Sequence, residues 1–388
     1  MKEIKGKNGK LIIKVLLVAA AVALRLAFFD YQTLDYIDFL SKWVQFFRNS
    51  GGFAALNMSV GNYNIPYLYF LAFFSYLPVK DLYLIKLLSC LFDFLLAYAC
   101  GKLVRLCGGN EDVGFFSVLF LPTVVINGAV WAQCDSSYAA LALLGLAVML
   151  ENRECSDSKG CAGIALMAAA FGFKLQAVFI LPVCLVLLFA GRIKWWHFFA
   201  FPLTYLLMIM PAVVLGRPFL ETLTLYFDQA GSVGDAPNYN APSLTALTQS
   251  PDSTTLIIFA FAAMMVLLLA AWIFRKKLTD RAIVIYALLL STVIPFLLPH
   301  MHDRYFFMAD VLSLVLACFI WQSFPAAVLQ QFGSLICYLA YLTRYYLRVG
   351  NIYLTNDRGA VAVLLALMIE TAVLIIEQRK DAKNPRSI

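Results

Sequence analysis

Residues 161–190 read CAGIALMAAAFGFKLQAVFILPVCLVLLFA, and Lys174 carries the only charge in this stretch. A single helix through all of it would place the basic residues that follow, Arg192 and Lys194, on the outer side of a membrane. Short cytoplasmic loops are the ones enriched in Lys and Arg, so two shorter helices that meet at FGFK fit better. An arm of this kind rises only about 18 Å, so the break should lie below the outer surface, enclosed by protein. We therefore predict that the chain turns back at Lys174.

The composition is that of a protein that crosses a bilayer many times. Hydrophobic residues make up 62% of the 388 residues and charged residues 14%, too few polar groups to cover a soluble domain of this size. We predict a single domain over residues 1–388, an all-α polytopic bundle of about 12 transmembrane helices. The predicted spans are 11–29, 82–104, 115–132, 136–150, 161–172, 175–190, 196–215, 254–274, 282–298, 305–321, 325–341 and 359–377.

The basic residues set the expected orientation. The net charge is +7, but Lys and Arg lie in short loops beside apolar stretches, so we attribute them to orientation and exclude nucleic-acid binding. The N-terminal lysines and the cluster RKKLTDR at 275–281 place both termini of a multi-pass cell-membrane protein in the cytoplasm. The first apolar stretch resembles a signal peptide, but it is long enough to span and further spans follow it, so we expect it to stay as a helix. The nine Cys include no CxxC pair, so neither a disulfide framework nor a zinc site is predicted.

This orientation gathers the unusual polar segments on the extracytoplasmic side. They are the first outer loop 30–81, the turn WAQCD at 131–135, Lys174, the loop 216–253, the turn PHMHDR at 299–304, and 342–358. Within the first outer loop, 36–49 and 66–77 have the spacing of short helices that lie on the membrane surface. The loop 216–253 is rich in Gly, Pro, Asn and Ser and is predicted to be a lid.

Asp35 and Asp38 in LDYIDF are the first candidates for chemistry. Three residues apart, they share a face of a helix, and two neighbouring carboxylates can hold different pKa values. We expect Asp35 to act as a general base, with Asp38 orienting the acceptor. The alternative is that Asp35 or Thr33 only caps the helix that follows.

The turn PHMHDR holds two of the three His of the chain. His300 and His302 point the same way if the backbone is extended there, and together with Arg304 and Lys174 they would clamp a phosphate. A metal site with Asp303 is the weaker interpretation, and we predict no metal and no cofactor. Arg304 could instead reach toward lipid headgroups.

Other polar residues are predicted to bind substrate or to stabilise the fold. Gln133 and Asp135 of WAQCD lie in a tight outward turn, where Asp135 could also cap the next helix. Charges inside the predicted spans need partners, and they are Arg25, Lys86, Asp93, Asp310 and Glu370. We expect structural pairing for Asp93 and Glu370, whereas Arg25 and Lys86 are close enough to the outer side to touch an anionic headgroup.

The order of these motifs resembles the GT-C membrane glycosyltransferases, in particular bacterial proteins related to the second mannosyltransferase of GPI-anchor assembly. The similar segments are LDYIDFLSKW, GGFAALN, NYNIPYLY, WAQCD, FKLQA, NAPSLTAL and HMHDRYFF. Trp43, Tyr63 and Asn240 lie in these segments and are predicted to contact substrate. Ala132 stands where related turns often have Gly, and Asp303 where they often have Glu.

The resemblance implies transfer of a hexosyl residue, mannosyl or glucosyl, from a polyprenyl-phosphate sugar to an extracytoplasmic glycan or glycolipid, with inversion. It assigns the catalytic carboxylate to Asp35 and the donor-phosphate contacts to His302, Arg304 and Lys174. The donor, the acceptor and membrane lipids are then the expected partners. Two other classes stay open: a lipid-linked glycan flippase or other transporter, and a membrane acyltransferase that uses His300 or His302 with Asp303.

Overall fold

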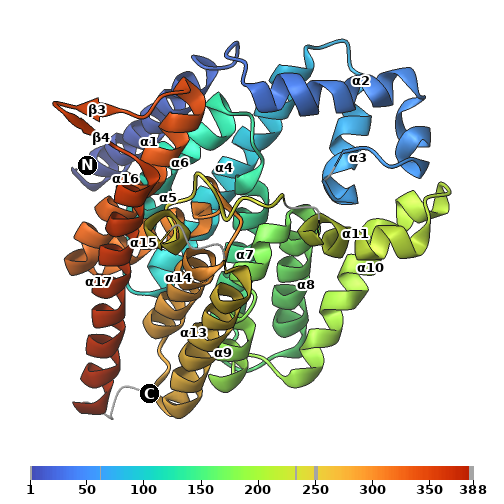
Figure 1. Cartoon of the computed structure of the whole chain (residues 1–388). Helices are drawn as coiled ribbons and strands as arrows, with labels where there is room; N and C mark the ends of the chain where they lie inside the picture. Colours follow the sequence, from blue (N-terminus) through green and yellow to red (C-terminus); the bar gives the residue numbers. More distant parts are fainter. Residues whose placement is uncertain (1, 62, 232–233, 249–251, 384–388) are drawn as a thin grey trace.

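The computed structural model describes residues 2–61, 63–231, 234–248 and 252–383. The chain is an all-α membrane protein whose long helices run side by side, with two small two-stranded sheets among the described residues (Figure 1). The termini predicted to be cytoplasmic, Met1 and 384–388, lie outside the described residues.

In the described part of the chain, six helical segments are long and apolar enough to cross a membrane. They are α4 (Asp81–Leu106), Trp195–Val214 with α10 (Ala200–Val214), α13 (Ser253–Ile273), α14 (Asp280–Leu297), Trp321–Thr343 with α16 (Phe324–Thr343), and Asn356–Arg379 in α17 (Asn356–Lys383). A bent pair, Glu111–Leu119 with Pro122–Val130, brings the number to seven if it counts as one span. The expected number of about 12 spans stays a prediction. Several predicted spans form shorter helices, among them α7 (Asp135–Leu150) and α15 (Phe307–Phe319). Both are mostly buried by other helices, and a helix that is enclosed by protein does not have to match the thickness of the bilayer.

The predicted break at Lys174 is confirmed. Helix α8 (Asp157–Phe173) ends there, Lys174 has an extended backbone, and the chain continues through Leu175–Phe179 into α9 (Val183–Phe189). The Lys174 side chain is buried, as expected for a turn enclosed by protein. Lys174 keeps its backbone hydrogen bonds, since its amide donates to the Ala170 carbonyl and its carbonyl accepts from the Ala177 amide, each at 3.1 Å.

The two ends of the bundle differ in composition. Basic side chains gather around the start of α14, where Arg153 and Arg192 both pair with Asp280, and the Arg281 Nε donates to the Cys107 carbonyl at 2.8 Å. The segments predicted to lie on the outer side converge at the other end. The loops that were expected to share a face therefore do share one, whichever side of the membrane that face meets.

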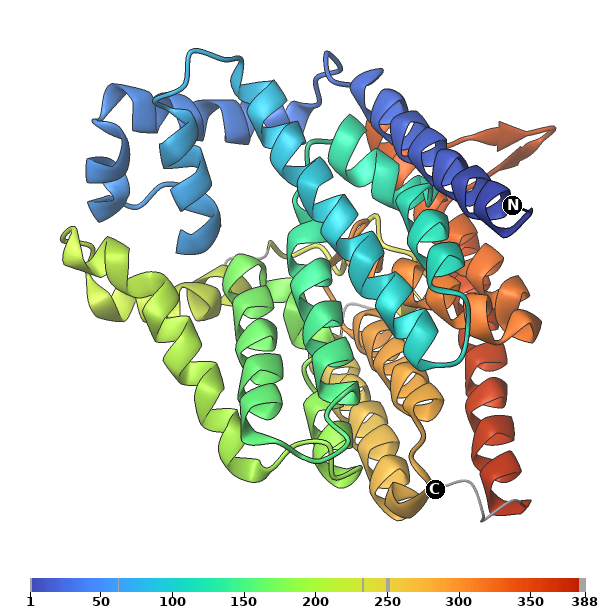
Figure 2. The ribbon, with the colours of Figure 1, turned by 180° about the vertical axis from the view of Figure 1, so that it is seen from behind.

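The first outer loop is largely helical. A π-helical turn (Tyr36–Leu40) leads into α2 (Ser41–Asn49), and a 3₁₀ turn (Gly52–Asn57) precedes α3 (Ile65–Phe74). Figures 1 and 2 show α2 lying across the top and α3 standing upright below it, in contact with α8 and α10. The position of α2 on a membrane surface stays a prediction. The expectation that α3 also lies flat on the membrane is wrong, because its side chains are mostly buried between those helices.

The described part of the predicted lid is more ordered than an irregular loop. It contains α11 (Phe219–Gly231), strand β1 (Asn238–Tyr239) and α12 (Leu244–Thr248). Strand β1 pairs in parallel with β2 (Met301–His302), so Tyr239 lies beside His302. A role in closing the site stays a prediction.

The charges inside the bundle find partners that differ in part from those expected. Arg25 in α1 (Lys2–Leu26) bonds to Asp93 at 2.9 Å and to the Leu119 carbonyl at 2.9 Å, so the expected headgroup contact is wrong. Lys86 is also buried and donates to the Phe28 and Tyr31 carbonyls, each at 2.6 Å. Asp310 accepts from Gln330 and Ser334. The expected pairing of Glu370 is wrong, because neither carboxyl oxygen has a hydrogen-bond partner among the described residues.

We predict that Arg25→Ala destabilises the protein by about 3–5 kcal/mol, because it leaves the Asp93 carboxylate buried without its cation. The control is Lys14→Ala on the same helix, whose partner Asp112 is half exposed, and it should cost about 0–1 kcal/mol. Unfolding of the purified protein in detergent measures both. Equal losses for the two variants would contradict the role of the buried pair.

Candidate functional site

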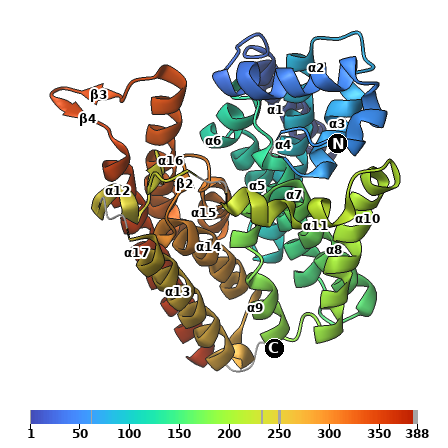
Figure 3. The same cartoon turned by 45° about the vertical axis from the view of Figure 1, so that its right-hand side comes forward.

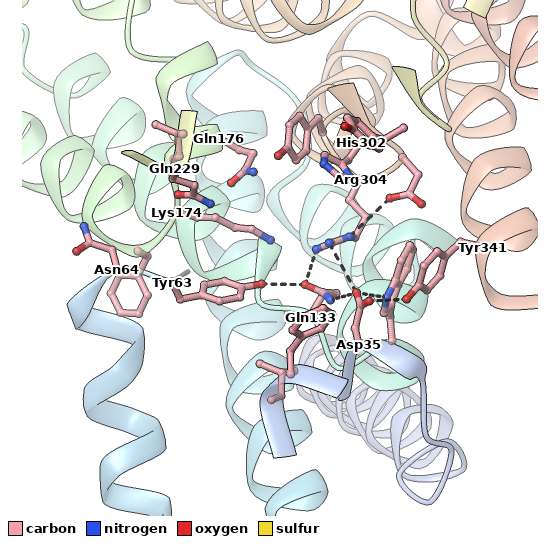
Figure 4. Close-up of a pocket in the computed structure, with 18 of the residues that line it drawn as sticks. Asp35, Tyr63, Asn64, Gln133, Lys174, Gln176, Gln229, His302, Arg304 and Tyr341 are labelled. Atoms are coloured by element: carbon pink, nitrogen blue, oxygen red, sulfur yellow. Dashed lines mark hydrogen bonds and ion pairs between the residues drawn. The ribbon is translucent and has the colours of Figure 1, made fainter. Parts of the chain in front are cut away.

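A cavity of about 560 Å³ opens at the end of the bundle that carries α2. Eight of the predicted site residues line it: Asp35, Trp43, Tyr63, Gln133, Lys174, Asn240, His302 and Arg304. Figure 4 labels six of them, Asp35, Tyr63, Gln133, Lys174, His302 and Arg304, which converge from the first outer loop, the WAQCD turn, the break after α8 and the turn before α15. Segments far apart in the sequence therefore meet in one pocket.

Asp35 accepts hydrogen bonds on both carboxyl oxygens. Trp131 Nε1 donates to Oδ2 at 2.9 Å, Gln133 Nε2 donates to Oδ2 at 2.7 Å, and the Tyr341 hydroxyl donates to Oδ1. Asp35 makes no capping bond, whereas the Thr33 hydroxyl accepts from the Tyr36 amide at 3.4 Å. A carboxylate offers about four lone-pair positions, so these three bonds leave one for a ligand.

Asp38 does not join Asp35. Its side chain is 51% exposed and pairs with Lys42 at 3.4 Å, and it is not among the residues that line the cavity. The physical reason is the π-helical turn Tyr36–Leu40, which is wider than an α-helix and turns residues three apart further from each other. The predicted pair of cooperating carboxylates is therefore not formed.

Arg304 lies at the centre of the pocket. Its Nη1 donates to Gln133 Oε1, and its guanidinium sits 5.1 Å above the Trp131 ring. The carboxylates of Asp35, Asp135 and Asp303 are each 3.7 Å from one of its nitrogens. Burial by itself would lower the pKa of Arg304, but Asp135 and the other acidic groups raise it well above its usual value, so the group stays charged.

Asp135 lies beneath the pocket and holds its cations. Its carboxylate is 1% exposed, pairs with Lys174 Nζ at 2.5 Å and accepts from Asn127 Nδ2 at 2.7 Å. The predicted substrate contact is not seen, since Asp135 is absent from the cavity lining, and it does not cap α7 either. Both carboxyl oxygens are engaged with the protein, so the residue positions Lys174 and Arg304.

The WAQCD turn has an unusual backbone. Ala132 has a φ of 63°, in the left-handed region that L residues with a Cβ adopt at a cost of about 1–2 kcal/mol. This explains why similar turns often carry Gly at the position of Ala132. The turn follows a π-helical segment (Ile126–Val130), and it directs Trp131 and Gln133 toward Asp35.

The two histidines separate. His302 stacks on Tyr239 with ring centres 4.6 Å apart, and burial followed by the Arg304 charge lowers its pKa to about 4. His300 has a φ of 61°, so the extended backbone that would align the two is absent. Its Nδ1 contacts the Ala236 carbonyl at 2.7 Å and its Nε2 the Ser253 hydroxyl at 3.2 Å. His300 lies outside the cavity lining, and His302 can bind an anion only as a neutral hydrogen-bond donor.

Among the described residues, no group of three or more His, Cys, Asp or Glu is placed to hold a metal ion. The expectation that the protein needs no metal or cofactor stays a prediction. Cations for an anionic ligand come from Arg304 and Lys174.

Sequence reasoning missed Tyr341 and the wall residues Asn64, Gln176, Gln229 and Tyr239. Tyr341 stacks on Trp131 with ring centres 4.3 Å apart and bonds to Asp35. A signal for it exists: polar residues recur on one face of α16 at four-, four- and three-residue spacing, namely Gln330, Ser334, Tyr338 and Tyr341. Such a stripe within an apolar helix indicates a face turned toward polar groups.

Comparison with known proteins finds a family match for one segment of the chain. Residues 74–190 match the N-terminal domain of a family of alpha-(1->6)-mannopyranosyltransferases. No curated protein matches the chain. The matched segment includes the WAQCD turn and the break at Lys174, and it agrees with the resemblance to GT-C mannosyltransferases drawn from the motifs.

Proposed function

Starting from a chain whose residues 74–190 match a mannosyltransferase family, we propose that it transfers a mannosyl residue from a polyprenyl-phosphate sugar to a hydroxyl group of an extracytoplasmic glycan or glycolipid. The observation that carries the proposal is a single pocket in which Asp35 lies 3.7 Å from Arg304, with Lys174 on the adjoining wall. A base and two cations are the groups that this displacement needs. The name of the matched family favours a 6-hydroxyl as the acceptor.

The reaction is a single displacement. Asp35 takes the proton from the acceptor hydroxyl, whose oxygen attacks the anomeric carbon while the bond from that carbon to the phosphate oxygen breaks. Arg304 and Lys174 stabilise the negative charge that develops on the departing polyprenyl phosphate. Because the hydroxyl attacks opposite the leaving group, the anomeric configuration inverts.

Arg304 has a donor available for the phosphate. Its Nε is buried and makes no hydrogen bond within the described residues, with Asp303 Oδ1 3.7 Å away. A buried guanidinium N–H without a partner is costly, and a phosphate oxygen is the acceptor that guanidinium groups bind well. This favours an anionic ligand above Arg304.

The expected side of the membrane supports a lipid-linked donor. The basic loops around Arg192 and 275–281 lie at the end of the bundle opposite the pocket, so the positive-inside rule directs the pocket outward. Nucleotide sugars are not available there, and the sequence holds no Gly-rich phosphate loop for one. An acyltransferase, which would use His300 or His302 with Asp303, has less support, because His300 contacts Ala236 and Ser253 and His302 packs against Tyr239 and Tyr305 instead.

We predict that Asp35→Asn lowers transfer about 10²–10⁴-fold, because an amide keeps the shape of the side chain but cannot take the proton. Asp38→Asn is the matched control: the same change three residues away, on a carboxylate outside the pocket, should leave turnover unchanged. Both variants are assayed in nanodiscs with radiolabelled polyprenyl-phosphate mannose, with thermal melting to check folding. Normal turnover by Asp35→Asn removes Asp35 from the mechanism, and a transporter would show no glycosylated product with either variant.

The pocket should bind its donor more weakly as pH rises through about 7. Burial raises the pKa of Asp303 to about 7, so this carboxyl is neutral below that pH and adds a negative charge beside Arg304 above it. The His302 imidazole, with its pKa lowered to about 4, stays neutral throughout. We expect the KM for the donor to increase between about pH 6 and about pH 8. Asp303→Asn should abolish this increase, and a variant that kept it would exclude Asp303 as the cause.

A further inference from the structure

The connection between α16 and α17 is a short hairpin that extends from the bundle. Strands β3 (Arg348–Val349) and β4 (Ile352–Tyr353) pair antiparallel around a turn in which Gly350 has a φ of 61°. Figures 1 and 3 show it projecting sideways from the same end as α2, on the opposite flank. Since it joins two helices of membrane-spanning length, it lies where both leave the bilayer.

The hairpin exposes an apolar and aromatic surface. Between 40% and 78% of each side chain is open in Tyr345, Tyr346, Leu347, Val349, Ile352 and Tyr353. These residues are consecutive or nearly so, and among the described elements the two strands pack mainly against each other. A continuous exposed apolar surface of this kind marks a contact with something outside the chain.

Two arginines give this surface a positive charge. Arg344 lies over the Tyr341 ring at 4.8 Å, and Arg348 lies over the Tyr353 ring at 5.4 Å. Arg348 also donates to the Gly350 carbonyl and to Asn351 Oδ1. Within the described residues neither guanidinium forms an ion pair with a carboxylate, so both charges stay uncompensated at the surface.

We propose that the hairpin, residues 344–354, docks on the anionic headgroup layer of the membrane at the mouth of the pocket. Tyrosine and aliphatic side chains beside arginine are the composition that suits this layer, with the rings at the headgroup boundary and the guanidinium groups on lipid phosphates. The attachment to two spans keeps the hairpin at headgroup height, which favours lipid over a protein partner that approaches from solution.

Two contacts connect the hairpin with residues that line the pocket. The Tyr346 hydroxyl donates to Asn240 Oδ1 at 3.4 Å, and Asn240 lines the cavity. Arg344 lies over the ring of Tyr341, which also stacks on Trp131 and whose hydroxyl bonds to Asp35. The hairpin therefore fixes two walls of the pocket relative to the membrane surface from which a lipid-linked substrate would enter.

The test places a fluorophore at the turn through Asn351→Cys in the full chain, after Ser replaces the partly exposed Cys155, Cys161 and Cys318. The protein is reconstituted in vesicles of phosphatidylcholine, with and without phosphatidylglycerol. Quenching by nitroxide on the lipid headgroup reports docking, and quenching by iodide reports exposure to water. We expect headgroup quenching that is stronger with phosphatidylglycerol, and iodide quenching that is correspondingly weaker.

Arg344→Gln with Arg348→Gln should reduce the ratio of docked to undocked hairpin about fivefold for each arginine replaced in the anionic vesicles. The matched control, Lys276→Gln with Lys277→Gln, removes two exposed charges at the opposite end of the bundle and should change nothing. Iodide quenching without lipid quenching overturns the proposal, and so does equal docking in both lipids. Quenching that disappears when the protein is diluted into excess lipid also overturns the proposal, because such a loss would show that the hairpin contacts a second copy of the chain. None of these readouts requires catalysis, so they stand apart from the proposed transferase activity.

Discussion

The pocket depends on one buried carboxylate. Asp135 lies beneath it with 1% of its side chain exposed, and an ion at that depth is tolerated only if cations and hydrogen-bond donors surround it. Lys174 comes from the break after α8, and Arg304 comes from the turn before α15. Because both cations interact with the carboxylate of Asp135, they are held in the pocket before any ligand binds. Little reorganisation of the protein is then needed when negative charge develops on a substrate.

Irregular backbone segments orient the other side chains of the pocket. The π-helical turns Tyr36–Leu40 and Ile126–Val130 and the left-handed Ala132 all adjoin the pocket. Such features cost stability and are common at functional sites, where they direct side chains that a regular helix would turn elsewhere. Here they bring Trp131 and Gln133 onto Asp35 and turn Asp38 away.

Apolar length and charge placement were enough to predict the helical membrane fold, the break at Lys174 and the convergence of Asp35, Gln133 and Arg304. These follow from the cost of polar groups in a bilayer, which the sequence displays directly. The direction of His300 depends on a single backbone torsion, and the place of Tyr341 depends on how α16 packs. Neither is set by local spacing. Helix lengths were also beyond prediction, because a short helix covered by others can look like a span in hydrophobicity alone.

The charges of the pocket nearly cancel, and this suits the proposed donor. Two cations face the carboxylates of Asp35 and Asp135, while burial keeps Asp303 largely protonated below about pH 7. A polyprenyl-phosphate sugar is a phosphodiester and would add one negative charge, so its ground state gains only modest attraction. As the sugar leaves, charge concentrates on the bridging phosphate oxygen, and each guanidinium or ammonium contact strengthens. In the proposed reaction Asp35 becomes neutral on taking the proton, which removes one of the three carboxylates that compete with the phosphate for Arg304. The attraction is then greater in the transition state than in the bound substrate, which is the condition for faster chemistry.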